Sequence, residues 1–138
     1  MMTNLSTILQ KAYKEKYAVG SFNAYNFETF KGIIDAGVET NTPIIVAFGA
    51  KYLTNMSVET ASALVHSLAK DLTIPVCLHL DHCKDLEIIK AAIEAGFGSV
   101  MYDGSALPFA ENVANTIKVC QAAHAHNVSV EAELGSLA

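Results

Sequence analysis

Short β-rich runs alternate with amphipathic helical stretches along the 138-residue chain, and this alternation limits the possible folds more than any other feature. The runs begin near residues 18, 44, 76, 99 and 128, so successive starts lie roughly 23 to 32 residues apart. A spacing near 30 residues is typical of a parallel strand followed by a crossover helix. The pattern therefore predicts a leading helix over residues 3–17, four βα units, and a fifth strand over residues 128–133.

Capping residues support these element boundaries. Asn26, Ser57 and Asp85 each stand just before an amphipathic stretch, and we expect each to cap the helix that follows. A proline opens the strands that begin near residues 44 and 76, and Pro108 is expected in the first turn of the last helix. No linker or low-complexity segment interrupts the pattern, so we expect one structural unit over residues 1–138.

Two α/β architectures fit this order of elements. One is an open, doubly wound sheet that is complete at five strands; the other is a (β/α)₈ TIM barrel, for which about 250 residues are usual. Function concentrates at one switch point of an open sheet, whereas all strand ends of a barrel converge on one site. Acidic or amide residues follow four of the five predicted strands: Asn23, Asp81, Asp103 and Glu133. This distribution favours the barrel, with residues 1–138 as the truncated N-terminal portion of a single barrel domain.

Composition excludes several classes of partner. The net charge is −5 and no run of lysines occurs, which argues against a nucleic-acid-binding protein. A phosphorylated substrate stays compatible, because metals, backbone amides and helix N-termini can hold phosphate locally. The longest apolar run, residues 44–48, is far too short to cross a membrane. Three cysteines without a C-x-x-C pair, and no secretory leader, predict reduced thiols and a cytoplasmic protein.

An acid beside an imidazole follows the apolar run 74–78. In this position Asp81 can accept a proton and His82 can bind a metal ion. Alternation along the strand places His79 on the same side as Asp81, where we expect it to support the site rather than bind the metal. The alternative is a solvated Asp81 that caps the following helix, next to an incidental His82.

A catalytic zinc ion usually takes three protein ligands. The other histidines, His66, His124 and His126, fall on predicted helices, which face outward in a barrel. His82 is therefore the one good histidine ligand, and Asp103 and Glu133 are possible helpers. The sequence Asp-Gly-Ser that begins at Asp103 is equally typical of a turn with a cap. The residues of this chain thus predict an incomplete metal site.

Four segments resemble, in the same order, those of the N-terminal half of class II, metal-dependent fructose-bisphosphate/tagatose-bisphosphate aldolases. They are GSFNAYN at residues 20–26, LHLDH at 78–82, SVMYDGS with LPFAEN at 99–112, and VEAELG at 130–135. Each segment is weak evidence alone, but the ordered set is specific and covers nearly the whole chain. The family fold is a (β/α)₈ barrel, in agreement with the architecture that the strand ends favour.

The resemblance implies a role for each candidate residue. His82 would be a ligand of the catalytic zinc, and Asp81 would exchange the proton of the substrate's C4 hydroxyl. Asp103 and Glu133 would line a secondary metal position, and Asn23 would contact substrate. The implied enzyme is a glycolytic lyase that reversibly cleaves fructose or tagatose 1,6-bisphosphate to dihydroxyacetone phosphate and glyceraldehyde 3-phosphate.

The chain departs from the family pattern in three places. The loop at residues 48–52 lacks a hydroxyl where the family often has a Ser or Thr for substrate phosphate, and Ala106 stands where many relatives have His. The family's two other zinc-ligand histidines belong to strands beyond Ala138. We therefore expect negligible turnover from the isolated chain. The alternative is a non-catalytic half-barrel whose unpaired first and fifth strands pair with another copy, which gives a homo-oligomer.

Overall fold

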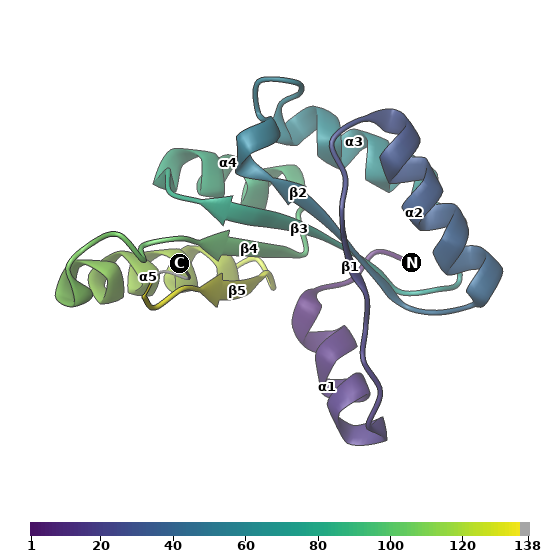
Figure 1. Ribbon diagram of the computed structural model, residues 1–138, viewed down its shortest axis with the longest axis horizontal. Helices are drawn as coiled ribbons and strands as arrows, with labels where there is room; N and C mark the ends of the chain where they lie inside the picture. The colour runs from purple at the N-terminus through teal and green to yellow at the C-terminus, as the bar shows by residue number, and fades with distance from the viewer. Residues whose placement is uncertain (136–138) are drawn as a thin grey trace.

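The computed structural model describes residues 1–135, so the last three residues of the predicted unit lie outside the described residues. The described part contains five α-helices, five strands and one 3₁₀ turn (Figure 1). In chain order they are α1 (Leu5–Glu15), β1 (Ser21–Asn23), α2 (Phe27–Thr40), β2 (Ile44–Gly49), η1 (Ala50–Tyr52), α3 (Val58–Ala69), β3 (Val76–Cys83), α4 (Leu86–Ala95), β4 (Ser99–Tyr102), α5 (Phe109–His124) and β5 (Ser129–Ala132).

The five strands form one parallel sheet in the order β1-β2-β3-β4-β5. A doubly wound sheet reverses its strand order at a switch point, and no reversal occurs among the described strands. Sequential order is that of a (β/α)₈ barrel, so the open-sheet alternative is wrong and the predicted barrel type is confirmed. All carboxyl ends of the strands consequently lie at one edge of the sheet, where the site is built.

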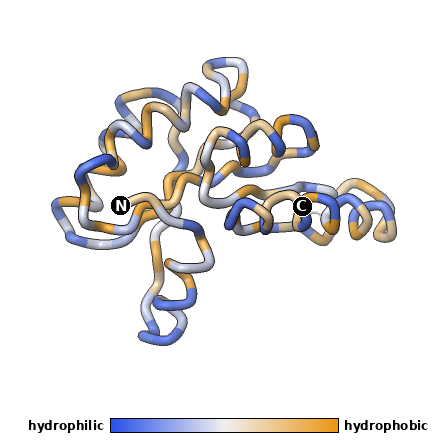
Figure 2. The backbone as a smooth tube through the Cα atoms, turned by 180° about the vertical axis from the view of Figure 1, so that it is seen from behind, coloured by the Kyte–Doolittle hydropathy of each residue, from blue (hydrophilic) through white to orange (hydrophobic). Residues whose placement is uncertain are grey.

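The main core lies between the sheet and helices α2 to α5. Alternate strand residues, among them Val46, Leu78 and Val100, are fully buried against these helices. Phe30 of α2 packs in a tilted arrangement against Phe48 of β2, with ring centroids 6.1 Å apart. Figure 2 shows the hydrophobic strands through the centre of the molecule and the mixed hydropathy of the helices around them. This layer fixes the strands whose ends carry the polar residues.

Helix α1 covers part of the opposite face of the sheet, away from the other helices (Figure 1). Its Ile8 packs against Ile45 and Cys77, which alternate with the residues of the main core. Burial raises the pKa of the Cys77 thiol to about 12, so this thiol stays protonated and inert at neutral pH. The N-terminal ammonium of Met1 donates to two carbonyl groups just before β3, those of Leu72 and Ile74.

Three predicted helix caps are confirmed. The side chains of Asn26, Ser57 and Asp85 accept hydrogen bonds from backbone amides in the first turns of α2, α3 and α4. The strand boundaries agree less well with the prediction. The first strand, predicted to begin near residue 18, is limited to Ser21–Asn23, because only these residues pair with β2. Pro108 precedes α5 at the cap position instead of lying inside its first turn.

Candidate functional site

A β-bulge near the end of β3 decides how Asp81 and His82 are presented. Leu80 pairs with Val100 of β4 and Cys83 pairs with Tyr102, so Asp81 and His82 together stand opposite one β4 residue. His82 has φ of 56°, a left-handed conformation that is uncommon for a residue with a side chain. Strict alternation would have sent His82 to the helix side with Leu80. The extra residue lets Asp81 and His82 act at the same rim, and bulges often occur beside active sites.

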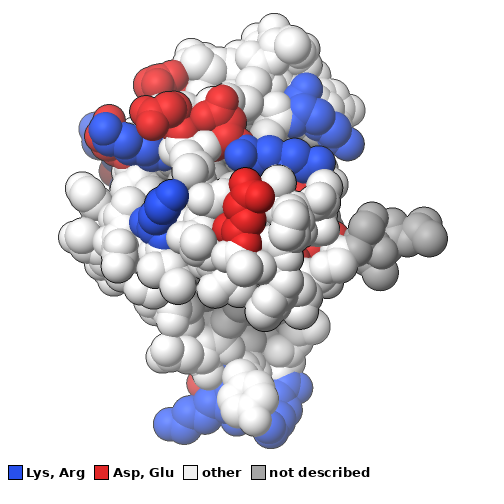
Figure 3. Space-filling view, turned by 90° about the vertical axis from the view of Figure 1, so that its left-hand side faces the viewer, with Lys and Arg blue, Asp and Glu red and all other residues white. Residues whose placement is uncertain are grey.

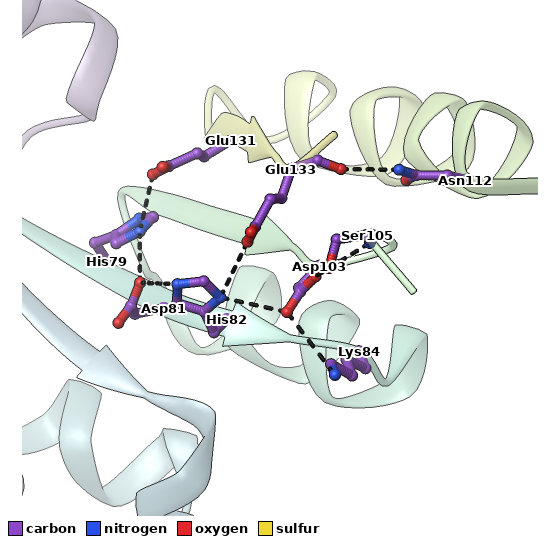
Figure 4. Close-up of polar contacts among 9 residues, drawn as sticks. All are labelled: His79, Asp81, His82, Lys84, Asp103, Ser105, Asn112, Glu131 and Glu133. Carbon is purple, nitrogen blue, oxygen red and sulfur yellow. Dashed lines mark hydrogen bonds and ion pairs between the residues drawn. The ribbon is translucent and has the colours of Figure 1, made fainter. Parts of the chain in front are cut away.

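His82, Asp103 and Glu133 converge at the carboxyl ends of three neighbouring strands (Figure 4). Nδ1 of His82 lies 3.3 Å from Oδ2 of Asp103 and 3.4 Å from Oε2 of Glu133. The three potential ligand atoms lie within 4.8 Å of one another. Imidazole nitrogen and carboxylate oxygens bind zinc at about 2.0–2.2 Å, so one ion can reach all three.

Glu133 gives the strongest reason to consider a cation here. Its Oε2 is buried and faces Nδ1 of His82 at 3.4 Å, but it has no hydrogen-bond partner among residues 1–135. Buried carboxylate oxygens nearly always have such a partner. The neighbouring Asp103 is already satisfied, because Ser105 donates to its Oδ1 from both the hydroxyl (2.6 Å) and the backbone amide (3.1 Å). The donor set and the unpaired oxygen fit a divalent metal ion.

The charges of the cluster favour its ionised form. The hydrogen bond from Ser105 is the main cause that lowers the pKa of Asp103, with help from His82 and Lys84. The hydrogen bond to Asp103 is the main cause that raises the pKa of His82, and the charges of Asp81 and Glu133 act in the same direction. An acidic setting of this kind holds a proton or a metal ion on His82. A surface hollow lined by His82, Met101, Glu131 and Glu133 keeps the cluster open to solvent.

Asp81 lies beside this cluster rather than in it. Its Oδ1 is 4.0 Å from Nε2 of His82 and also 4.0 Å from Nε2 of His79. The His79 ring is buried and its Nδ1 hydrogen bonds with the Ser99 hydroxyl at 2.9 Å, which fixes the direction of Nε2. Asp81 is partly exposed, so its carboxylate is accessible from solvent at this rim.

Glu131 is a neighbour that the sequence analysis missed. Its carboxylate lies 3.3 Å from Nε2 of His79, and this contact is the main cause that lowers the pKa of Glu131. The signal was present, because Glu131 and Glu133 are two residues apart on the predicted fifth strand, where alternation gives them the same side. Both acids lie in the family segment at residues 130–135, but a role was predicted only for Glu133.

The remaining predicted residues take separate positions. Asn23 ends the edge strand β1 at the same rim of the sheet, but in residues 1–135 no hydrogen bond links its side chain to the cluster. His66 lies on α3 and contacts the backbone oxygen of Gly96, and His124 lies in the last turn of α5, as expected for helix residues. His126, predicted on the same helix, lies in the turn after α5 and contacts the backbone oxygen of Ala122. Figure 3 views one side of the molecule, where basic and acidic side chains alternate in the upper part and further basic side chains lie at the lower tip.

Comparison with known proteins gives one consistent result. The model of the family described as "Fructose-bisphosphate aldolase class-II" matches residues 3–138. A sulfofructosephosphate aldolase of Alkalicoccus urumqiensis is 45% identical over 131 residues, which is 95% of this chain and 46% of that protein. A fructose-bisphosphate aldolase of Staphylococcus aureus is 43% identical over 141 residues, covering 99% of this chain and 49% of that protein.

Solved structures give the same relation. The YdjI aldolase of Escherichia coli K12 superposes with a TM-score of 0.90 at 37% identity, covering 98% of this chain and 51% of that one. The fructose-bisphosphate aldolase of Campylobacter jejuni gives a TM-score of 0.87 at 26% identity, covering 97% and 47%. This chain thus spans about half the length of the curated relatives it matches. Within residues 1–135 no helix is both long and apolar enough to cross a bilayer. The match over nearly all residues, with these relatives and this fold, establishes that the chain belongs to the class II fructose-bisphosphate aldolase family.

Proposed function

We propose that this chain supplies the proton-transfer residue and part of the metal site of a zinc-dependent aldolase. The observation that carries the proposal is the convergence of His82, Asp103 and Glu133 around one point, with Asp81 beside them. The unpaired buried oxygen of Glu133 supports a cation at that point. Family membership supports aldol cleavage as the reaction.

Each residue has a separate task in this reaction. His82 holds the metal ion, which, when bound, polarises the substrate ketone and stabilises negative charge. Asp103 and Glu133 provide carboxylate oxygens for a secondary position of the ion. Asp81 takes the proton of the substrate's C4 hydroxyl when the C3–C4 bond breaks and returns it in the reverse direction. Asn23 contacts the substrate from the end of β1.

The proposed substrate is fructose or tagatose 1,6-bisphosphate, cleaved to dihydroxyacetone phosphate and glyceraldehyde 3-phosphate. One relative is named for fructose bisphosphate and another for sulfofructose phosphate, so the second anionic group differs among relatives. In this chain the loop after β2 carries Lys51 and Tyr52 on a 3₁₀ turn, where the family often has a small hydroxyl residue. An assay should therefore include three sugars: fructose 1,6-bisphosphate, tagatose 1,6-bisphosphate and sulfofructose phosphate.

The small number of histidine metal ligands in this chain supports negligible turnover by the isolated chain. The cluster in residues 1–135 contains one histidine, and the other two zinc-ligand histidines of the family belong to strands that follow the matched half. We expect activity only when a second half completes the barrel, and we expect a chelator to abolish that activity and zinc to restore it.

A chimera tests this function. The chain is joined to the unmatched half of the S. aureus relative, and folding is checked by circular dichroism and sedimentation. We expect metal-dependent cleavage of a ketose bisphosphate, and a loss of about 10²–10⁴-fold in kcat for Asp81→Asn. The matched control is Asp71→Asn, an exposed acid in the turn before β3, which should keep full activity. A folded chimera with no activity on any of the three sugars, or an active Asp81→Asn variant, would contradict the proposal.

A second candidate is a non-catalytic half-barrel that associates with a copy of itself. It is supported by two apolar grooves, one beside β5 and α5 and the other beside β1 and α2, at the two edges of the sheet. The two candidates are compatible, because association can complete the sheet without completing the metal site.

A further inference from the structure

Asn112 on α5 is a buried polar side chain that the proposed chemistry does not use. It is only 6% exposed, although asparagine is mostly found at protein surfaces. Its Nδ2 donates to the backbone oxygen of Glu133 at 2.8 Å (Figure 4). Its Oδ1 accepts from the Thr116 hydroxyl at 3.3 Å. A buried amide with both ends engaged holds a fixed position relative to its partners.

The hydrogen bond to Glu133 lies just beyond the end of the hydrogen-bond ladder between β4 and β5. The ladder between β4 and β5 ends at the pair Tyr102 and Ala132, so Glu133 is the first residue beyond it. The Glu133 carbonyl therefore takes its hydrogen bond from a side chain on α5 instead of from a neighbouring strand. Without that donor, the main chain that carries the Glu133 carboxylate would lose its hydrogen bond to α5.

Gly104 allows Asn112 to reach this place. A Cβ atom on Gly104 would lie 2.2 Å from Oδ1 and 2.6 Å from Cγ of Asn112, distances that real side chains do not tolerate. Gly104 directly follows Asp103, the other acid of the cluster. The amide of Asn112 is thus packed between the segments that carry the two acids, one after β4 and one after β5.

We propose that Asn112 is a positioning residue for the metal cluster. It ties the main chain of Glu133 to α5 and so keeps the Glu133 carboxylate beside His82 and Asp103. The inference rests on the proposed function for the use of the cluster, but the hydrogen bond itself acts on Glu133 whether or not a metal is present. The test can therefore distinguish the positioning role of Asn112 from the metal-binding role of the cluster.

The first measurement uses metal-free protein. The resonance of the Glu133 side-chain carboxyl carbon is recorded by NMR at one neutral pH for wild type, Asn112→Ala and the control Asn115→Ala. Asn115 is on the same helix, and its amide donates at 3.0 Å to the Tyr102 hydroxyl instead of to Glu133. We expect the Glu133 resonance to move in Asn112→Ala and to stay unchanged in Asn115→Ala, because only the first variant frees the Glu133 main chain.

The second measurement uses Co²⁺ as a spectroscopic probe in chimeras that carry the same three versions of this chain, because the second half supplies the two other histidine ligands. Residues that orient metal ligands typically change affinity by about 10–100-fold, so we expect that loss for Asn112→Ala and none for Asn115→Ala. If Asn112→Ala does not fold, Asn112→Asp replaces it, with Asn115→Asp as control. The aspartate keeps the size and the acceptor for Thr116 but turns an oxygen towards the Glu133 carbonyl.

The outcomes distinguish the two ideas. An unchanged Glu133 resonance in folded Asn112 variants, or the same change in the Asn115 controls, overturns the positioning role. If Asn112→Ala shifts the Glu133 resonance but the wild-type chimera does not bind Co²⁺, the positioning role is supported and the metal site of the proposed function is contradicted. A shifted resonance together with weakened Co²⁺ binding supports both.

Discussion

Asp103 is the most firmly held acid of the cluster. Its side chain is 9% exposed, Ser105 donates to one of its oxygens, and His82 and Lys84 approach the other at 3.3 and 4.0 Å. These contacts favour the ionised carboxylate and outweigh the cost of burial, so the pKa of Asp103 is lowered. A carboxylate that stays ionised at low pH is a ready metal ligand.

Ser105→Ala should raise the pKa of Asp103, because the Ser105 hydroxyl is the main cause of its lowering. A hydrogen bond to a charged group contributes about 1.5–3 kcal/mol, so we expect a loss of stability of about that size or less at neutral pH. A lowered pKa stabilises the fold above the unfolded-state value, near 3.9, and this contribution disappears as pH falls through the folded-state value. The gap between the two proteins should therefore close below pH 4.

NMR titration of the Asp103 carboxyl carbon and urea unfolding at pH 7 and pH 3 give the two readings. Ser67→Ala, an exposed serine on α3, serves as the control substitution. An unchanged Asp103 titration in Ser105→Ala would show that the hydroxyl does not hold this carboxylate.

The sequence singled out most residues of the candidate cluster but not their local geometry. Asp81, His82, Asp103 and Glu133 were predicted because polar residues follow apolar strands, and the structure brings the last three together. The bulge at His82 was not predictable, because alternation assumes one residue per pleat. Asn112 gave no local signal either, because its partner lies 21 residues further along the chain.

At the scale of the elements, side-chain caps decide where the helices begin. The side chain of Asn26 accepts from the Thr29 amide at 3.0 Å, and the Thr29 hydroxyl accepts from the Asn26 amide at 3.2 Å. This reciprocal capping box satisfies two amides that the helix itself leaves unpaired. It also sets the entry of α2 directly after β1 and Asn23. Such local chemistry is visible in sequence, which is why the three caps were predicted correctly.

Asn26→Ala should destabilise the protein by about 1 kcal/mol, the usual cost of losing an N-cap side chain. The change is measured as a lower midpoint in urea unfolding with an unchanged slope. Lys90→Ala, at an exposed position within α4, is the control and should change stability by less than about 0.5 kcal/mol. Equal midpoints for Asn26→Ala and wild type would mean that α2 begins without help from this cap.

Strand limits were harder to predict than helix starts, for a physical reason. A strand ends where its neighbour stops pairing, and this depends on residues far away in the chain. The apolar character of residues 18–20 suggested a longer first strand, yet only Ser21–Asn23 pair with Ile45–Ala47. Likewise, Glu133 belongs to the predicted fifth strand but stands beyond the last pair of the ladder.

At the scale of the whole molecule, each of the two edges of the described sheet lies beside an apolar groove. The β5 edge adjoins a groove lined by side chains of α5 and by Leu134, and several of its apolar residues are well exposed: Phe109 (65%), Val113 (40%), Ile117 (52%) and Leu134 (75%). The β1 edge adjoins a second groove that includes Phe22, which is 51% exposed, and Ile33 of α2. Exposed apolar patches beside unpaired parallel strands favour association with another barrel segment.

Ile117→Lys should therefore weaken self-association of the isolated chain. Lysine at this position places a charge in the groove beside α5, where a partner's apolar surface would otherwise be buried. Sedimentation velocity over a 100-fold range of protein concentration should give a rising sedimentation coefficient for wild type and a smaller rise for the variant. Gln121→Lys, an exposed position one helical turn further along α5 and outside that groove, adds the same charge and should behave as wild type. A wild-type chain that stays monomeric at every concentration would mean that these edges need the second half of an aldolase barrel and accept no copy of this one.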